Sequence, residues 1–255
     1  MSKISVKDLI IFVTGVSRKR GIGRALVEEA IKRGAKKVYV TARHAAQLDD
    51  LVAKFQEKVV AVELDVTNLE QIQRVAQKAN DTQVLVNNSG AAGFSGCIYN
   101  YDEKTARQEL EVNYFGPLHL MNAFSNSLIK NGNGAIVNII SIGGLYPSPS
   151  HVTYSASKAA LYSLTQAVRI EMMMNSHFIP VFGVYPGPID TDMADGIEVK
   201  KEFPANLALR VFDNMEQGVL DITTDALSDN FVSYLKKDPK AIEAIKKEFG
   251  KRNQN

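Results

Sequence analysis

The stretch IIFVTGVSRKRGIG, residues 10–23, joins an apolar run to a turn that holds three glycines and three cations. Downstream of the turn, apolar side chains recur at helical spacing, and Gly34 supplies a stop; they are Ile22, Ala25, Leu26 and Ala30. The stretch therefore predicts a buried strand, a glycine turn and an amphipathic helix.

Short Val/Ile-rich runs without polar alternation recur along the chain, which is typical of strands covered on both faces. They are residues 9–13, 37–41, 59–64, 84–86, 135–140 and 179–184. Helical patterns lie between them, with long helices expected at 103–130 and 154–175. This alternation predicts an α/β fold, a doubly wound, Rossmann-like parallel sheet.

The last quarter of the chain is less regular. Residues 219–222 predict a final strand, and helical patterns follow Pro204 and Pro239. A short substrate lid is expected around residues 190–205, and a helical segment at the C-terminal end. Because no linker or low-complexity stretch interrupts the chain, residues 1–255 are expected to form one domain.

Composition limits the function classes. A net charge of +2 is too small to indicate a nucleic-acid footprint. The first apolar run is too short for a membrane span or a signal-peptide core, so we expect a cytoplasmic protein without a membrane partner. The only cysteine, Cys97, is expected to be a buried small residue, and no histidines show metal-ligand spacing, so no metal is assigned.

The glycine turn is a candidate anion site. In an open parallel sheet, the first strand-to-helix turn can present bare N–H groups and a helix dipole to a pyrophosphate. Gly15, Gly21 and Gly23 lie there, but Leu26 occupies the third position of the strict G-x-G-x-x-G pattern. A tight connection that needs glycines only for its geometry is the alternative.

The end of the second strand indicates the type of dinucleotide. Arg43 stands where NAD-selective proteins usually place a carboxylate, and a guanidinium can pair bidentately with a phosphate. Together with Arg18, Lys19 or Arg20, it predicts a site for the 2′-phosphate of NADP. The alternative is that these cations are simply solvated.

The stretch YSASK supplies the catalytic candidates. Tyr154 and Lys158 lie one helical turn apart, so an ammonium can stay near a phenol and bring its pKa closer to neutral pH. Tyr154 then becomes a usable general acid. Ser141 ends the fifth predicted strand at the same sheet edge, where its hydroxyl could hold a carbonyl oxygen. In isolation, this Tyr–Lys spacing is common by chance.

Other motifs follow the remaining strands in order. Asp65, after the third strand, could accept a hydrogen bond from an adenine amino group. NNSG at 87–90 follows the fourth strand, Asn113 lies in the next long helix, and YPGPIDT at 185–191 follows the sixth strand.

From about Asp8 to Thr191, these residues resemble the short-chain dehydrogenases/reductases in their single-domain form. The resemblance implies NAD(P)-dependent interconversion of a carbonyl and an alcohol, here with NADP(H) preferred and a small-molecule substrate. It implies Tyr154 as proton donor, Ser141 as the residue that orients the substrate oxygen, Lys158 as the group that lowers the phenol pKa and binds the nicotinamide ribose, and Asn113 as support for a water-linked proton path. The cofactor-binding residues expected are Gly15, Ser17, Arg18, Gly21, Ile22, Gly23, Arg43, Asp65, Val66, Asn88, Gly90, Tyr154, Lys158, Pro186, Gly187 and Thr191.

The sequence departs from the family pattern in two places. Five residues, 16–20, separate Thr-Gly from the next glycine where the family usually has three, and NNSG replaces the commoner NNAG. The Tyr–Lys spacing argues against the enoyl reductase branch. The resemblance also implies a homodimer or homotetramer built on the two long helices. A non-catalytic NADP-binding regulator or scaffold on the same fold is the alternative function.

Overall fold

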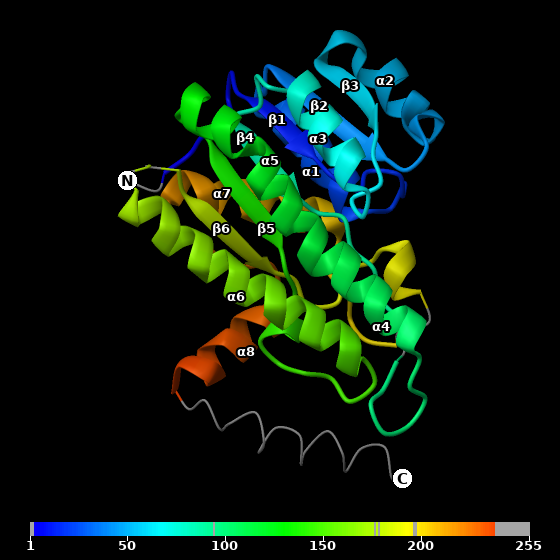
Figure 1. Cartoon of the computed structure of the whole chain (residues 1–255). Coiled ribbons are helices and arrows are strands. Elements are labelled where there is room, and N and C mark those ends of the chain that lie inside the picture. Colours follow the sequence, from blue (N-terminus) through cyan, green and yellow to red (C-terminus); the bar gives the residue numbers. More distant parts are fainter. Residues whose placement is uncertain (1–2, 94, 176, 178, 196–197, 238–255) are drawn as a thin grey trace.

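The computed structural model describes residues 3–93, 95–175, 177, 179–195 and 198–237. Seven parallel strands form one sheet in the order β3-β2-β1-β4-β5-β6-β7 (Figure 1). They are β1 Ile10–Val13, β2 Lys37–Ala42, β3 Val59–Glu63, β4 Val84–Asn87, β5 Ala135–Ile139, β6 Val181–Tyr185 and β7 Asp221–Thr223. The reversal of order beside β1 confirms the predicted doubly wound sheet.

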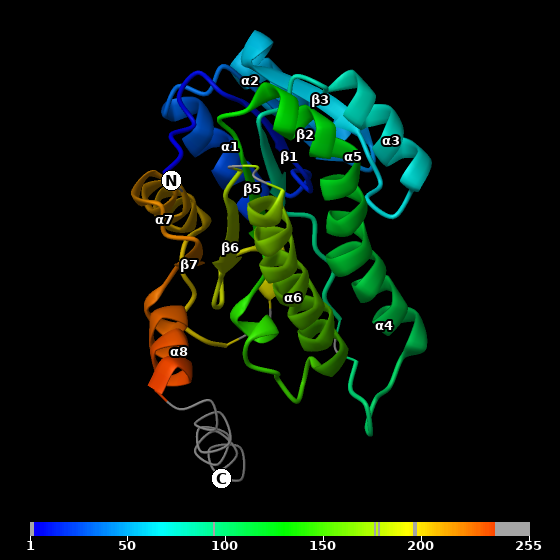
Figure 2. The same ribbon diagram turned by 60° about the vertical axis from the view of Figure 1, so that its left-hand side comes forward.

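Helices cover both faces of the sheet. One side carries α1 Ile22–Lys32 and α7 Pro204–Gln217, and the other carries α3 Leu69–Lys78, α5 Gly116–Asn131 and α6 Val152–Met174 (Figure 2). The remaining α-helices are α2 Asp49–Phe55, α4 Glu103–Leu110 and α8 Ala226–Lys237. Because every strand is parallel, all seven carboxyl ends lie at one edge.

The core follows from the pleat of β1. Ile11 and Val13 face the layer of α1 and α7, whereas Ile10 and Phe12 face the layer of α3 and α5. Both faces of β1 are therefore buried, as expected for a run without polar alternation. This packing fixes the end of β1, and with it the glycine turn, in the middle of the sheet.

The observed elements differ from the expected ones in several places. The expected helix 103–130 contains a π-helical turn at Glu111–Phe115 between α4 and α5. Strand β6 begins after Pro180, which has no N–H to donate. Sequence reasoning did not identify α2, α3 or α8, and the helical pattern expected after Pro239 lies outside the described residues. Cys97 is exposed, because it lies in the loop between β4 and α4.

Candidate functional site

The glycine turn is tied to the NNSG segment at the carboxyl edge of the sheet. Thr14 Oγ1 accepts hydrogen bonds from the backbone N–H groups of Asn88 and Ser89, both at 2.9 Å. The Asn88 amide donates to the carbonyls of Thr14 and Gly15 at 2.8 and 3.1 Å. The ends of β1 and β4 therefore form one rigid unit.

Each glycine of the turn has a packing reason. Gly15 has a φ of +71°, and a Cβ there would lie 2.8 Å from Ser89 Cα. A Cβ at Gly23 would lie 2.7 Å from Asn88 Nδ2, and one at Gly21 would lie 2.9 Å from the Arg18 carbonyl. The close packing of the turn therefore requires these glycines, as the tight-connection interpretation predicts. It does not exclude a ligand on the outer side of the turn.

The N-terminus of α1 suits an anion. Gly21 caps it without a side chain, and no acidic residue lies in the first turn. Its N–H groups and helix dipole are open to a negatively charged group. Ser17 and Ile22, also expected at the cofactor, are both partly buried within this turn.

The cations of the turn have separate environments. Arg20 pairs with three carboxylates that follow β6, Asp190 at 3.4 Å, Asp192 at 3.6 Å and Asp195 at 2.8 Å. These carboxylates raise the pKa of Arg20, and the hydrogen bond that Arg20 donates to Asp195 has the largest effect. Arg20 therefore joins the turn to the expected lid, which leaves it poorly placed for a 2′-phosphate. Residues 196 and 197 of that lid lie outside the described part.

The other two arginines remain open to an anion. Arg18 and Arg43 are exposed, and in the part of the chain that the structure describes neither is paired with a carboxylate. Arg43 directly follows β2, as predicted. Both guanidinium groups are available to a phosphate, and the exposed ammonium of Lys19 adds its charge near Asp50.

Asp65 and Val66 follow β3. Asp65 Oδ1 accepts hydrogen bonds from the Thr67 N–H and hydroxyl at 2.9 and 2.7 Å. This oxygen caps a local turn, so only the other carboxylate oxygen is open for an adenine amino group. Val66 is buried against Gly116, where a Cβ would come within 3.2 Å of it.

Ser141, Tyr154 and Lys158 meet beside the end of β5. Tyr154 faces the Ser141 hydroxyl, which accepts a hydrogen bond from the Gly143 N–H at 3.0 Å. Lys158 Nζ lies 5.9 Å from the centroid of the Tyr154 ring. A Cβ at Gly143 would stand 3.3 Å from both Ser141 Oγ and Tyr154 Cε1, so a larger residue there would press on both side chains.

The influences on the pKa of Tyr154 differ from the expected lowering by Lys158. Burial raises the pKa of Tyr154, the facing Ser141 hydroxyl lowers it, and Glu109 raises it. The expected lowering by Lys158 is not found in this arrangement, because the Lys158 ammonium instead donates to the Ile139 carbonyl at 2.9 Å. Burial lowers the pKa of Lys158 to about 8.

Asn113 occupies the π-helical turn and is fully buried. Its side chain accepts from the Ala91 N–H at 2.9 Å and donates to the Ala91 carbonyl at 2.8 Å and Ser157 Oγ at 2.9 Å. Between Asn113 and Lys158 lies Gly90, where a Cβ would be 3.6 Å from Asn113 Oδ1 and 3.8 Å from Lys158 Nζ. NNSG thus connects the glycine turn to the Tyr–Lys helix.

The Pro186–Gly187 turn is held by a residue that sequence reasoning missed. Buried Asp225 accepts from the Gly187 N–H at 2.8 Å, and a Cβ at Gly187 would lie 2.6 Å from Asp225 Oδ1. Asp225 also accepts from the Ser228 N–H at 2.9 Å at the start of α8. Its place before a helical run is an N-cap signal that could have identified it. Thr191, after this turn, is buried.

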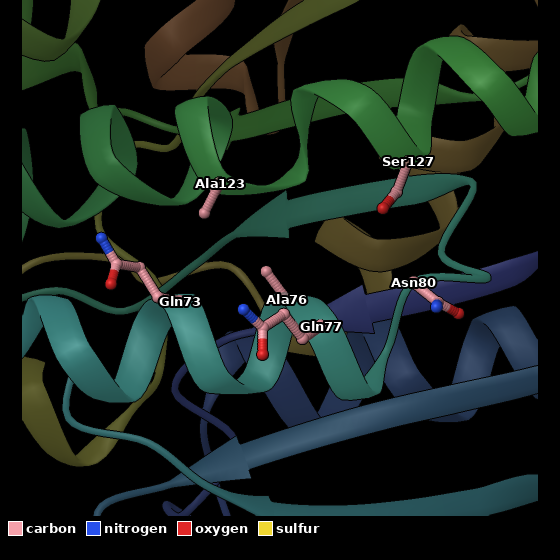
Figure 3. A pocket seen from close by; sticks show the side chains of 6 residues that line it. All are labelled: Gln73, Ala76, Gln77, Asn80, Ala123 and Ser127. Carbon is pink, nitrogen blue, oxygen red and sulfur yellow. The ribbon is translucent and has the colours of Figure 1, made fainter.

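A hollow of the surface lies away from the candidate site and contains no charged side chain among its lining residues. This groove of about 400 Å³ lies between α3 and α5 (Figure 3). Its lining consists of amide side chains such as Gln73 and Gln77, two alanines and Ser127. Its lining continues to Asn80, beyond the end of α3, which places it toward the amino ends of the strands and away from the site. Within the described ranges, we find no cluster of His, Cys, Asp and Glu able to hold a metal, and no helix both long and apolar enough to cross a bilayer.

Comparisons with known proteins agree with this geometry. The family profile described as short chain dehydrogenase matches residues 9–202. An uncharacterized oxidoreductase of Staphylococcus saprophyticus is 30% identical over 199 residues, 75% of this chain and 82% of the relative. A short chain dehydrogenase from Burkholderia cenocepacia, solved with NADP, has 36% identity and a TM-score of 0.88, covering 94% of this chain and 98% of that one.

A second solved structure shows the same fold at lower identity. This short chain dehydrogenase/reductase from Burkholderia phymatum, in complex with NAD, is 22% identical with a TM-score of 0.82, covering 93% of this chain and 96% of that one. The profile match spans most of the chain and includes the glycine turn, Asn113, Ser141, Tyr154 and Lys158. The chain is a member of the short-chain dehydrogenase/reductase family of oxidoreductases.

Proposed function

We propose that this protein is an NADP(H)-preferring reductase that interconverts a small carbonyl compound and its alcohol, with Tyr154 as the proton donor. The observation that carries the proposal is the meeting of Tyr154, Ser141 and Lys158 at the sheet edge that also holds the glycine turn. A phenol, a hydroxyl and an ammonium around one point suit a carbonyl oxygen that gains negative charge.

The residues of this edge fit a nicotinamide dinucleotide. The uncapped N-terminus of α1 suits the pyrophosphate, and Arg43 and Arg18 suit a third phosphate. Lys158 Nζ donates one hydrogen bond, to Ile139, and has further N–H groups for a ribose. When bound, the nicotinamide supplies hydride for reduction or accepts it for oxidation.

The protein's own groups supply the proton and the position. In reduction, the Tyr154 hydroxyl donates its proton to the substrate oxygen while the Ser141 hydroxyl donates a hydrogen bond to it. The Lys158 ammonium donates to the Ile139 carbonyl in this arrangement, so its part in the proposal is to bind the ribose rather than to lower the pKa of Tyr154. A water-linked path through the Asn113 region returns the proton to Tyr154.

The preference for NADP(H) rests on two supports. Arg43 occupies the end of β2 with no carboxylate partner among the described residues, and the Burkholderia cenocepacia relative at 36% identity was solved with NADP. The Burkholderia phymatum protein, solved with NAD, is too distant to support either cofactor.

A carbonyl screen tests the activity. Purified protein is mixed with NADPH or NADH and a panel of ketones and aldehydes, and loss of reduced-nicotinamide absorbance is followed. We expect turnover with NADPH for at least one class. Binding of NADPH in a calorimeter without turnover of any carbonyl would contradict the proposal and favour a non-catalytic NADP-binding regulator.

We also propose that the protein is a homodimer or homotetramer built through α4, α5 and α6. These helices and the π-helical turn between α4 and α5 expose large apolar side chains, among them Leu110, Phe115 and Ile170. Light scattering is expected to give two or four times the chain mass, and a monomer would reject this assembly.

A further inference from the structure

Asn113 and Glu109 are buried side chains that both connect the α4 region to the loop after β4 and to α6. Asn113 bonds to Ala91 in the loop after β4 and to Ser157 on α6, from its place after α4. One helical turn earlier lies Glu109, near the end of α4, with only 1% of its surface exposed. Residues four apart share a helix face, so both side chains point toward the loop and α6.

Glu109 repeats the pattern of Asn113 one turn away. Its Oε1 accepts a hydrogen bond from the Gly93 N–H at 2.6 Å, in the loop after β4. Its Oε2 accepts from the Thr153 hydroxyl at 2.5 Å, in the first turn of α6. Short hydrogen bonds to a carboxylate are among the stronger ones in proteins, and these two are shielded from water.

The contacts on α6 fall next to the catalytic residues. Ser157 precedes Lys158, and Thr153 precedes Tyr154. Asn113 therefore fixes the turn of α6 that carries Lys158, and Glu109 fixes the turn that carries Tyr154. From this geometry we infer that Glu109 is a positioning residue for Tyr154, acting through Thr153 and by its charge.

The charge of Glu109 bears on Tyr154 directly. The charged and titratable groups facing Tyr154 are Lys158 on its own helix, His151 before that helix and Glu109 on α4, with the Ser141 hydroxyl after β5. Glu109 raises the pKa of Tyr154. Burial lowers the pKa of His151, and Glu109 opposes that effect. The carboxylate thus favours the protonated phenol, the form that donates.

Two variants separate charge from position. Glu109→Gln keeps an oxygen for Gly93 and an amide for the Thr153 hydroxyl but removes the charge. Thr153→Val removes the hydroxyl at nearly constant shape, and Thr153→Ser restores it. Glu111→Gln is the matched control, because Glu111 is exposed and only two residues away.

Two measurements are made: an NMR titration of protein labelled at tyrosine Cζ, and the pH profile of kcat/KM. The Tyr154 resonance is assigned by its loss in Tyr154→Phe. In Glu109→Gln the pKa of Tyr154 and the alkaline limb of the profile are expected to move to lower pH, with no change in Glu111→Gln. Thr153→Val is expected to lose about tenfold or more in kcat with unchanged NADPH affinity, and Thr153→Ser to recover it.

The inference rests on the proposed reductase function, but the NMR titration does not need turnover. An enzyme that reduces no carbonyl would remove the proposed function, whereas the shift of the Tyr154 resonance would still support the effect of Glu109. Identical Tyr154 titration in Glu109→Gln and Glu111→Gln, or full kcat in Thr153→Val, would overturn the inference.

Discussion

Replacing Lys158 by methionine is predicted to stabilise the ligand-free protein while removing its activity. Lys158 is 4% exposed, and burial lowers its pKa from 10.5 to about 8. That difference corresponds to about 3 kcal/mol of destabilisation at pH 7. Methionine has a similar length and no charge, but it leaves the Ile139 carbonyl without its donor, which costs about 1 kcal/mol. The net gain expected at pH 7 is about 2 kcal/mol.

The pH dependence distinguishes this explanation from simple repacking. Between about pH 8 and 10.5 the unfolded chain holds the Lys158 proton more firmly than the folded chain, so the stability of the wild type rises with pH across this window. The methionine variant lacks this gain of about 3 kcal/mol, so its advantage should be lost by pH 10.5, where the wild type should be the more stable protein by roughly 1 kcal/mol. Urea unfolding of both at pH 7 and pH 10.5, at one protein concentration, measures it. A variant no more stable at pH 7, or a difference that stays constant with pH, would refute the reasoning.

Three other substitutions test separate parts of the site. Arg43→Asp should shift the NADPH-to-NADH ratio of kcat/KM toward NADH by ~10-fold or more, since it removes a phosphate partner. The shift should exceed that of Arg43→Gln. An unchanged ratio would show that Arg43 does not select between the two cofactors. Arg20→Gln should raise the substrate KM severalfold at low salt and less at high salt, because its three carboxylate partners are exposed; the neighbouring Lys19→Gln is the control, and equal effects would exclude a link between the turn and the lid. Asp225→Ala should cost about 2 kcal/mol in urea unfolding and raise the cofactor KM, because it leaves the Gly187 N–H unpaired; unchanged values of both would contradict its role at the Pro-Gly turn.

The sheet was predictable from sequence because its strands are covered on both faces. Runs such as 84–86 and 135–140 lack polar alternation, and a parallel sheet between two helical layers buries such runs on both faces. The π-helical turn at Asn113 was not predictable, since it arises from tertiary hydrogen bonds to Ala91 and Ser157 rather than from local propensity. Helix α8 was not predicted, although Asp225 directly before residues 226–237 is an N-cap signal.

The parts of the candidate site that directly follow a strand were predictable from the sequence. Parallel strands bring the residues after each carboxyl end to one edge, which suffices to place Arg43, Asp65, Ser141 and Pro186 along the same edge of the sheet. The role of Arg20 was not predictable, because its partners lie about 170 residues away. Glu109 was missed for a related reason, although its spacing of four from Asn113 is a signal that the sequence contains.

Tyr154→Phe is the measurement that tests the central claim most directly. The change removes the hydroxyl and keeps the ring that packs beside Ser141 and Lys158. Turnover of the best carbonyl substrate is expected to fall by ~10²-fold or more, while the dissociation constant for NADPH stays within about twofold of the wild type. Turnover close to that of the wild type in this variant would contradict Tyr154 as the proton donor and, with it, the chemistry proposed for this site.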